Sequence, residues 1–321
     1  MKGLILKSKF LGSLVGAAVG DAVGAAFEGS YVVNIEDIQT TVEGQNVLAY
    51  TDDTHMMIGV AESLIRNKGF NGEGMANTFV QNYELEPFRG YGPGPPSIFQ
   101  MVRDGEAWDK AAQKLYHGGS YGNGSAMRIA PVGVLYHDDL ETAREIAYKS
   151  SLITHAHILG KEGAALQAYA IALVTGLQPQ ALNRSNFIEK IRNYAEDDVY
   201  RQKIIKIEEL LDSGDRIRVA REIGNGIEAF NSVPTAIYSF LVCPDSFTEA
   251  VLYAVSLGGD TDTIGAMTGA ISGAYLGIES IPASWRDKLE NKLYIEQLAE
   301  KLWSLHVEHG KSVKNEHQPN T

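Results

Sequence analysis

Apolar residues recur at three- and four-residue spacing along most of the chain. The same periodicity appears over residues 141–154, 157–176, 204–214 and 288–305. This spacing places the apolar side chains on one face of an α-helix. Near the N-terminus the periodic positions are Phe10, Leu11, Leu14, Val15, Ala18 and Val19. Pieces with strand-like alternation, such as YVVNI (31–35), are too short to build a sheet, so the sequence predicts an all-α protein.

Many of the predicted helices are rich in glycine and alanine, which allows helix axes to approach closely in a compact multi-helix core. Two stretches dense in glycine and proline, 87–97 and 117–125, indicate loops. The sequence has neither an internal repeat nor a Ser/Thr/Gly-rich linker. We therefore expect a single-domain helix bundle over residues 1–310, followed by a polar, disordered tail at 311–321.

The net charge of −12 over 321 residues argues against general binding to nucleic acid or to an anionic membrane, since both need basic patches. The N-terminal stretch resembles a signal peptide, but Asp21 interrupts its apolar run before a bilayer span is complete. The single cysteine, Cys243, is expected to be a buried, inert thiol in a reducing compartment. These features favour a cytoplasmic protein, with a monomer as the default assembly.

Two acidic clusters carry most of the candidate chemistry. YTDDT (50–54) and GGDTDT (258–263) each combine aspartates with threonines at the start of a predicted helix. Aspartate and threonine are good helix N-caps, which is the alternative for either cluster alone. Adjacent carboxylates repel each other and are costly to bury unpaired. Because the donors are all oxygens, the pair of clusters favours Mg²⁺ or Mn²⁺ over Zn²⁺, and four aspartates could neutralise two such ions.

The loop GGSYGNGS (118–125) offers a second kind of chemistry. Successive backbone N–H groups in such a loop can bind phosphate oxygens, although most loops of this composition are plain turns.

Six motifs in order match a known family: GDAVGAAFEG, YTDDT, RGYGPG, GSYGNGSAMR, THAH and GGDTDT. Over roughly residues 8–277 the chain resembles the ADP-ribosylglycohydrolases, which are related to dinitrogenase reductase-activating glycohydrolase. RGYGPG followed by GSYGNGSAMR is most similar to the branch that removes serine-linked ADP-ribose, poly(ADP-ribose) and O-acetyl-ADP-ribose.

The resemblance implies an all-α fold with two Mg²⁺ or Mn²⁺ ions in a central cleft. Glu28, at the end of an apolar helix, matches the family's mobile glutamate and could act as base, acid or gate; the alternative is a solvated helix end. Asp53 is the second candidate for assisting the attacking water. The family's metal ligands fall on Thr51, Asp52, Asp53, Asp260, Asp262 and Thr263.

The resemblance also implies substrate contacts. The diphosphate and the adjoining ribose would bind Gly119, Ser120, Tyr121, Gly122 and Asn123. The ribose that is released would lie against Gly90, Gly92 and Gly94. His155 matches a histidine that contacts the ligand, although a lone histidine at a helix start is otherwise a cap or core residue.

Five neighbouring residues complete the predicted site. Tyr116 or Tyr121 could stack on adenine, with Tyr116 one position away from the family's aromatic residue. Arg128 could pair with phosphate or with a buried acid, and we favour the acid. Asp21 is expected to support the metal ligands or to make a structural hydrogen bond, and His157 is expected to be structural.

The resemblance predicts a metal-dependent hydrolase that cleaves the ribosyl C1 bond of ADP-ribosylated acceptors and releases ADP-ribose. A catalytically silent ADP-ribose-binding or structural protein on the same fold is one alternative. An unrelated metal-dependent phosphohydrolase, which would release phosphate from ADP-ribose, is another.

Overall fold

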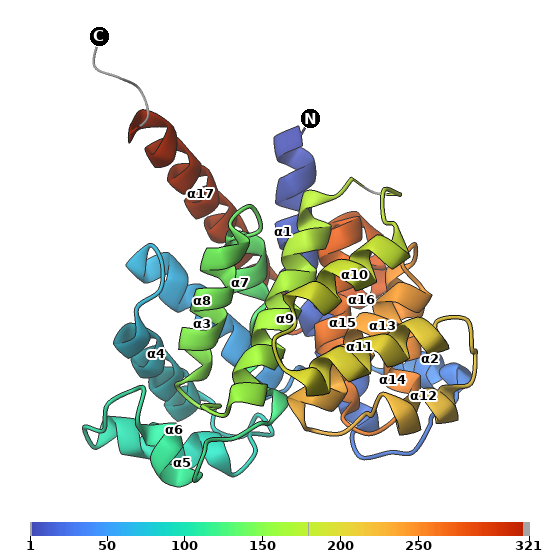
Figure 1. The fold of residues 1–321 in the computed structure, drawn as a ribbon, viewed down its shortest axis with the longest axis horizontal. Helices are drawn as coiled ribbons and strands as arrows, with labels where there is room; N and C mark the ends of the chain where they lie inside the picture. The colour runs from blue at the N-terminus through green and yellow to red at the C-terminus, as the bar shows by residue number, and fades with distance from the viewer. Residues whose placement is uncertain (1, 179, 317–321) are drawn as a thin grey trace.

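A computed structural model describes residues 2–178 and 180–316 and is built from helices (Figure 1). Among these residues the only β-type pairings are two isolated bridges, Leu48 with Leu289 and Gly122 with Glu228. The prediction of an all-α fold is confirmed. The long helices are α1 (Lys2–Gly24), α2 (Ile35–Gly44), α3 (Asp52–Asn67), α4 (Gly72–Leu85), α5 (Gly94–Arg103), α8 (Leu140–Ser151), α9 (Ile158–Gly176), α10 (Arg184–Tyr194), α11 (Asp198–Leu210), α13 (Ala229–Val242), α14 (Phe247–Ser256), α15 (Thr261–Leu276) and α17 (Lys292–Glu316). Shorter elements are η1 (Ala25–Phe27), α6 (Ala111–Leu115), η2 (Asn123–Ser125), α7 (Ala130–Leu135), α12 (Arg216–Glu222), η3 (Ile278–Ser280) and α16 (Ala283–Lys288).

Helices α1 and α15 form the closest pair in the fold and run antiparallel to each other. A β-carbon added to Gly20 would lie 2.5 Å from the carbonyl carbon of Gly265 and closer still to its oxygen. The two backbones therefore touch, and only glycine allows this separation. The contact brings the end of α1 against the start of α15, where the second acidic cluster lies. Three glycines of α1 face three of α15 in this way: Gly12, Gly16 and Gly20 against Gly273, Gly269 and Gly265.

The N-terminal helix is long and apolar enough to cross a membrane by length and composition alone. The segment Gly3–Phe27 has a mean hydropathy of 1.6 in its most apolar window, and 78% of that window is buried inside the fold. A core helix of this kind meets the same length and composition test as a membrane span. Asp21, which interrupts the apolar run, is itself fully buried.

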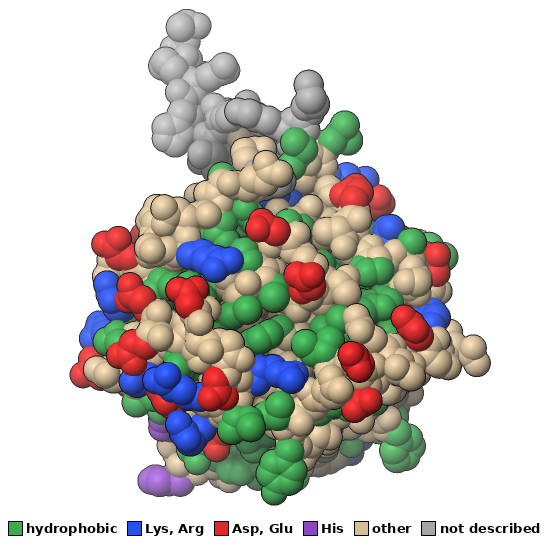
Figure 2. Space-filling model, turned by 90° about the vertical axis from the view of Figure 1, so that its right-hand side faces the viewer, with side chains coloured by type: hydrophobic (Ala, Val, Ile, Leu, Met, Phe, Trp, Pro, Cys, Tyr) green, Lys and Arg blue, Asp and Glu red, His purple; other side chains and the backbone are tan. Residues whose placement is uncertain are grey.

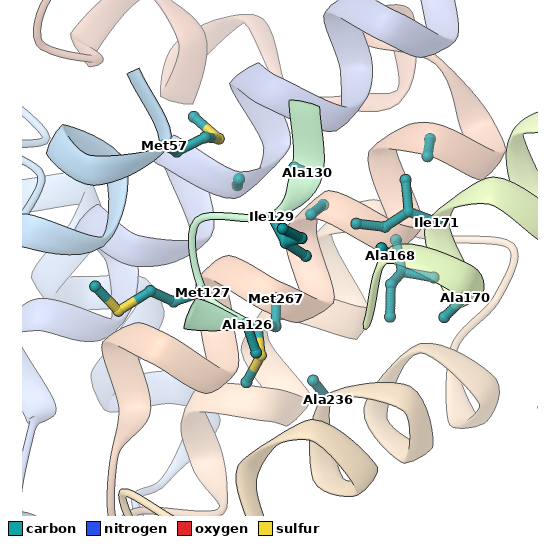
Figure 3. Close-up of a cluster of buried hydrophobic side chains, with 14 of the residues drawn as sticks. Met57, Ala126, Met127, Ile129, Ala130, Ala168, Ala170, Ile171, Ala236 and Met267 are labelled. Carbon is teal, nitrogen blue, oxygen red and sulfur yellow. The ribbon is translucent and has the colours of Figure 1, made fainter. Parts of the chain in front are cut away.

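The core continues beneath the glycine-rich loop. Figure 3 shows Met57 from α3, Ala168 and Ile171 from α9, and Met267 from α15 in one cluster with Ala126, Met127, Ile129 and Ala130. Cys243, which follows α13, was expected to be buried, but the structure leaves it half-buried. This partial burial raises the pKa of its thiol.

Acidic and basic side chains are interspersed over the face shown in Figure 2, with hydrophobic side chains between them. Helix α17 extends to Glu316, so the structure continues as helix into the region predicted as a tail. Residues 317–321 of that tail lie outside the described residues.

Candidate metal centre and cleft

Two helix N-termini meet at a cleft with a volume of about 320 Å³: α3 begins after Thr51, and α15 begins after Asp260. Acidic groups in a first helical turn are stabilised by the helix dipole. Most of the residues predicted from the sequence line this cleft: Glu28, Thr51, Asp52, Asp53, Gly90, Gly92, Gly94, Tyr116, Ser120, Gly122, Asn123, His155, Asp260, Asp262 and Thr263.

The capping alternative holds for one cluster but not for the other. Thr51 is the N-cap of α3, and its hydroxyl accepts a hydrogen bond from the backbone N–H of Asp53 at 3.3 Å. Asp260 stands at the N-cap position of α15, but its side chain makes no capping hydrogen bond. Capping therefore does not use the carboxylate of Asp260, which lines the cleft.

Asp21 of α1 holds the start of α3 in place. Its carboxylate accepts hydrogen bonds from the backbone N–H and the hydroxyl of both Thr51 and Thr54, at 2.6–3.1 Å. These bonds are structural, as one of the two expectations for Asp21 had it. They also orient the segment that carries the candidate metal ligands Thr51, Asp52 and Asp53, which was the other. Thr261 does the equivalent for α15, since its hydroxyl donates to the carbonyl of Gly24 at 2.9 Å.

The donor set fits divalent cations. Carboxylate oxygens of Glu28, Asp260 and Asp262 lie within 4.8 Å of one another. At that separation two carboxylates repel by about 3 kcal/mol at an effective dielectric constant of about 20. Oδ2 of Asp53 is buried and has no hydrogen-bond partner among the described residues. A buried oxygen without a donor beside crowded carboxylates is the situation that a hard cation relieves.

The same crowding raises the proton affinity of the cluster. Burial, reinforced by the charges of Asp21 and Asp262, raises the pKa of Asp52 to about 7. Burial and the neighbouring Asp260 raise the pKa of Asp262 to about 8. Burial and the same neighbours raise the pKa of Asp53 well above its ordinary value. The cluster therefore needs either protons or metal ions to offset its charge.

Glu28 is exposed at the mouth of the cleft, but the chain that follows it is anchored. Gly29 donates its N–H to the carbonyl of Gly259, and Gly259 donates to the carbonyl of Ser30, both at 2.8 Å. Gly258 and Gly259 have φ values of 71° and 75°, which favour glycine. The glycines before Asp260 thus provide the tight turn and the docking point for the segment after Glu28.

Asn123 joins the glycine-rich loop to the second acidic cluster. Its side-chain amide donates to the carboxylate of Asp260 and to the hydroxyl of Ser232, the latter at 3.0 Å. Its backbone N–H donates to the carbonyl of Ile227 at 2.9 Å. The loop is therefore held directly beside the candidate metal ligands.

Two predicted substrate residues do not line the cleft. Gly119, with φ 86°, packs against the backbone of Ala156 and His157. The ring of Tyr121 lies against His157, with ring centroids 5.5 Å apart. Of the two tyrosines expected near adenine, Tyr116 is the one that lines the cleft.

The expected acidic partner of Arg128 is absent among the described residues, so that interpretation is wrong. The buried guanidinium donates to the hydroxyl of Thr154 at 2.8 Å and to the carbonyl of Ser150 at 3.0 Å, and it lies over the ring of Phe79. His157 is structural as expected: it is the N-cap of α9, and its Nδ1 accepts from the N–H of Leu159.

Sequence reasoning missed several cleft-lining residues, namely Met56, Pro93, Pro95, Gly124, Met127, Thr154 and Ile227. Six of them stand within or beside a recognised motif, but an apolar or hydroxyl residue there carries no signal of its own. Ile227 lies in none of the motifs. It lines the cleft because its carbonyl holds Asn123.

A second group with donor atoms within 4.8 Å of one another lies elsewhere and consists of His137, Asp138 and His306. Nδ1 of His137 and Nδ1 of His306 lie within hydrogen-bond distance of the carbonyls of Val134 and Leu135. No sequence motif indicated this group.

Fold and cleft together define a class: an all-α protein with an oxygen-only ligand set for divalent cations and a glycine-rich loop suited to an anionic ligand. The family model for ADP-ribosylglycohydrolase matches residues 3–312. The chain belongs to the ADP-ribosylglycohydrolase family.

Individual relatives agree with this assignment. The chain is 36% identical over 340 residues to the ADP-ribosylhydrolase ARH3 of Bos taurus, covering 92% of each protein. It is 38% identical over 336 residues to ARH3 of Xenopus tropicalis, covering 93% of this chain and 96% of that one. A solved structure titled ADP-ribosylglycohydrolase-related protein complex has the same fold, with a TM-score of 0.72, 24% identity and coverage of 94% of this chain and 99% of that one.

Proposed function

We propose that this chain is a metal-dependent hydrolase that cleaves the ribosyl C1 bond of ADP-ribosylated acceptors and releases ADP-ribose. The observation that carries the proposal is the convergence of the two acidic clusters with the glycine-rich loop in one cleft, fixed by the bond between Asn123 and Asp260. Membership of the family and the similarity to proteins named ADP-ribosylhydrolase ARH3 support the same reaction.

The residues that would hold the cations are Thr51, Asp52, Asp53, Asp260, Asp262 and Thr263, which line the cleft. When bound, two divalent cations, which we propose to be Mg²⁺ or Mn²⁺, orient the substrate and offset negative charge. Asp21 and Asn123 hold these side chains in position, because Asp21 is hydrogen-bonded to Thr51 of the first cluster and Asn123 to Asp260 of the second.

We propose that the carboxylates of Glu28 and Asp53 accept and return the proton of the attacking water. Glu28 stands exposed at the mouth, within 4.8 Å of carboxylate oxygens of Asp260 and Asp262. The free Oδ2 of Asp53 lies at the buried end. Glycosidases use two carboxylates for the same proton transfers. Breaking the C1 bond passes through an oxocarbenium-like state.

Beside the metal ligands, Ser120, Gly122, Asn123 and His155 would bind the diphosphate and its ribose, and Gly90, Gly92 and Gly94 would line the ribose that is released. Tyr116 would stack on adenine. We propose serine-linked ADP-ribose, poly(ADP-ribose) or O-acetyl-ADP-ribose as substrate, because RGYGPG followed by GSYGNGSAMR is most similar to the branch that acts on them.

The test is release of ADP-ribose from matched serine-linked, arginine-linked and O-acetyl-ADP-ribose substrates, each with Mg²⁺, Mn²⁺ or a chelator. We expect metal-dependent release from at least one, and loss of it in Asp262→Ala. Asp245→Ala, which removes an exposed carboxylate away from the cleft, is the matched control. ADP-ribose binding without turnover of any substrate would favour a silent reader, and release of phosphate would favour a phosphohydrolase.

We also propose that the protein acts as a cytoplasmic monomer. The single cysteine supports a reducing compartment. Sedimentation of the purified protein and localisation of a tagged chain test the two statements.

A further inference from the structure

One hydroxyl group connects a fully buried cation to the histidine of the cleft. Oγ1 of Thr154 lies 2.8 Å from Nη1 of Arg128 and 2.8 Å from Nδ1 of His155. Arg128 and Thr154 are buried, and His155 is 8% exposed where it lines the cleft. Neither Arg128 nor Thr154 is needed to explain the metal ligands or the glycine-rich loop.

The direction of the hydrogen bonds in this chain follows from counting protons. A guanidinium can only donate, so Oγ1 of Thr154 accepts from Arg128. The hydroxyl has one proton of its own, and the described residues offer it no acceptor other than Nδ1 of His155. If Nδ1 carried a proton, the buried hydroxyl proton of Thr154 would have no acceptor, which is costly. Thr154 therefore donates to Nδ1, and Nδ1 is unprotonated. In a neutral imidazole the proton then sits on Nε2.

The histidine is held neutral and in one orientation. Burial, reinforced by the positive charge of Arg128, lowers the pKa of His155 to about 3. The ring packs against Gly124, where an added β-carbon would lie 2.9 Å from Nε2, and against Gly122, where it would lie 3.3 Å away. These two glycines leave room for the ring, and Nε2 has no hydrogen-bond partner among the described residues.

We propose that Arg128 and Thr154 are positioning residues that fix His155 as the neutral Nε2–H tautomer, so that His155 donates a hydrogen bond to an anionic oxygen of the ligand beside the glycine-rich loop. The identity of that ligand as ADP-ribose rests on the proposed function, whereas the tautomer does not. Arg128 acts on His155 through Thr154, because its other hydrogen bond to an oxygen goes to the carbonyl of Ser150, and its remaining polar contact is with Sδ of Met56 at 3.7 Å.

The protein contains internal references for both tautomers. Nδ1 of His157 accepts from the N–H of Leu159, so that nitrogen is unprotonated. Nδ1 of His137 lies 2.9 Å from the carbonyl of Val134, so that nitrogen must carry a proton. A long-range proton–nitrogen correlation spectrum of the histidine-labelled full chain, assigned by single His→Gln variants, distinguishes the two patterns.

The expected result is that His155 shows the pattern of His157, with an unprotonated Nδ1, in wild type and in Thr154→Ser. In Thr154→Val, which keeps the shape but removes the hydroxyl, the fixed tautomer is lost.

Binding of ADP-ribose, measured by calorimetry in the presence of Mg²⁺, should weaken roughly five- to tenfold in Thr154→Val and recover in Thr154→Ser, as for the loss of one hydrogen bond. Thr175→Val removes another buried threonine hydroxyl, bonded only to the carbonyl of Ile171, and should change neither readout.

A wild-type His155 with the pattern of His137 would overturn the proposal, as would unchanged ADP-ribose affinity in Thr154→Val. Absence of ADP-ribose binding by the wild-type protein would instead overturn the proposed function and the ligand assigned to Nε2–H. The spectrum of the free protein would still decide the tautomer.

Discussion

Gly20 of α1 and Gly265 of α15 meet backbone to backbone, and this contact fixes where the two acidic clusters lie relative to each other. One turn further, a β-carbon added to Gly24 would lie 2.6 Å from Cα of Asp262. The separation of the two helix axes is therefore part of the geometry of the cleft, and not merely of the core.

Gly20→Ala should destabilise the protein by roughly 3 kcal/mol or more, because the methyl group would meet rigid backbone and not a movable side chain. Gly310→Ala is the control: it lies in α17 with open space around it and should be neutral or stabilising by up to about 1 kcal/mol. Urea denaturation of both variants measures the difference. Equal effects would show that the helices can separate to make room for the methyl group.

Asp21→Asn should lower metal affinity about tenfold to a hundredfold without removing any predicted ligand. The amide presents N–H groups where the carboxylate now accepts from Thr51 and Thr54, so the start of α3 shifts. Titration calorimetry with Mn²⁺ measures the affinity, and Asp245→Asn is the control. Unchanged affinity would mean that α3 holds its ligands without Asp21.

The metal-free protein should lose stability as the pH rises from about 4 to about 8. Burial raises the pKa values of Asp21 and Asp52 to about 7 and that of Asp262 to about 8, while unfolded aspartate titrates near 4. The folded state thus binds more protons than the unfolded state in this window, and stability falls as those protons leave.

Thermal unfolding with a chelator should show this loss, at about 1.4 kcal/mol for each unit by which a pKa is raised. Saturating Mn²⁺ should reverse most of it near pH 8 and little of it near pH 5, because metal binds the deprotonated cluster. Asp262→Asn should flatten the metal-free profile. A profile that rises with pH would contradict the assigned charge crowding.

Glu28→Gln should reduce kcat by roughly a hundredfold or more while ADP-ribose binding stays within about threefold, if the carboxylate handles the proton of the attacking water. Glu43→Gln, an exposed substitution on α2, serves as the control. Progress curves give kcat, and calorimetry gives binding. A matching loss of ADP-ribose affinity would assign Glu28 a role in holding the ligand.

The sequence determined the elements of this protein and the chemistry that they carry. Helical periodicity, capping residues such as Thr51, and glycines such as Gly258 and Gly259 act within a few positions of the chain. Their local order was enough to predict an all-α fold, several of its helices, both acidic clusters and the glycine-rich loop. The composition of the clusters was enough to favour an oxygen-ligating cation.

Only the tertiary structure decided which of these features meet. The bonds from Thr51 and Thr54 to Asp21, and from Asn123 to Asp260, join residues 30 to 137 positions apart, and the contact of Gly20 with Gly265 spans still more of the chain. Such pairings depend on how whole helices pack, which a local pattern does not encode. For the same reason, the sequence left open whether Tyr116 or Tyr121 lines the cleft. It also led to the wrong prediction of an acidic partner for Arg128, whose hydrogen bonds go to the hydroxyl of Thr154 and the carbonyl of Ser150.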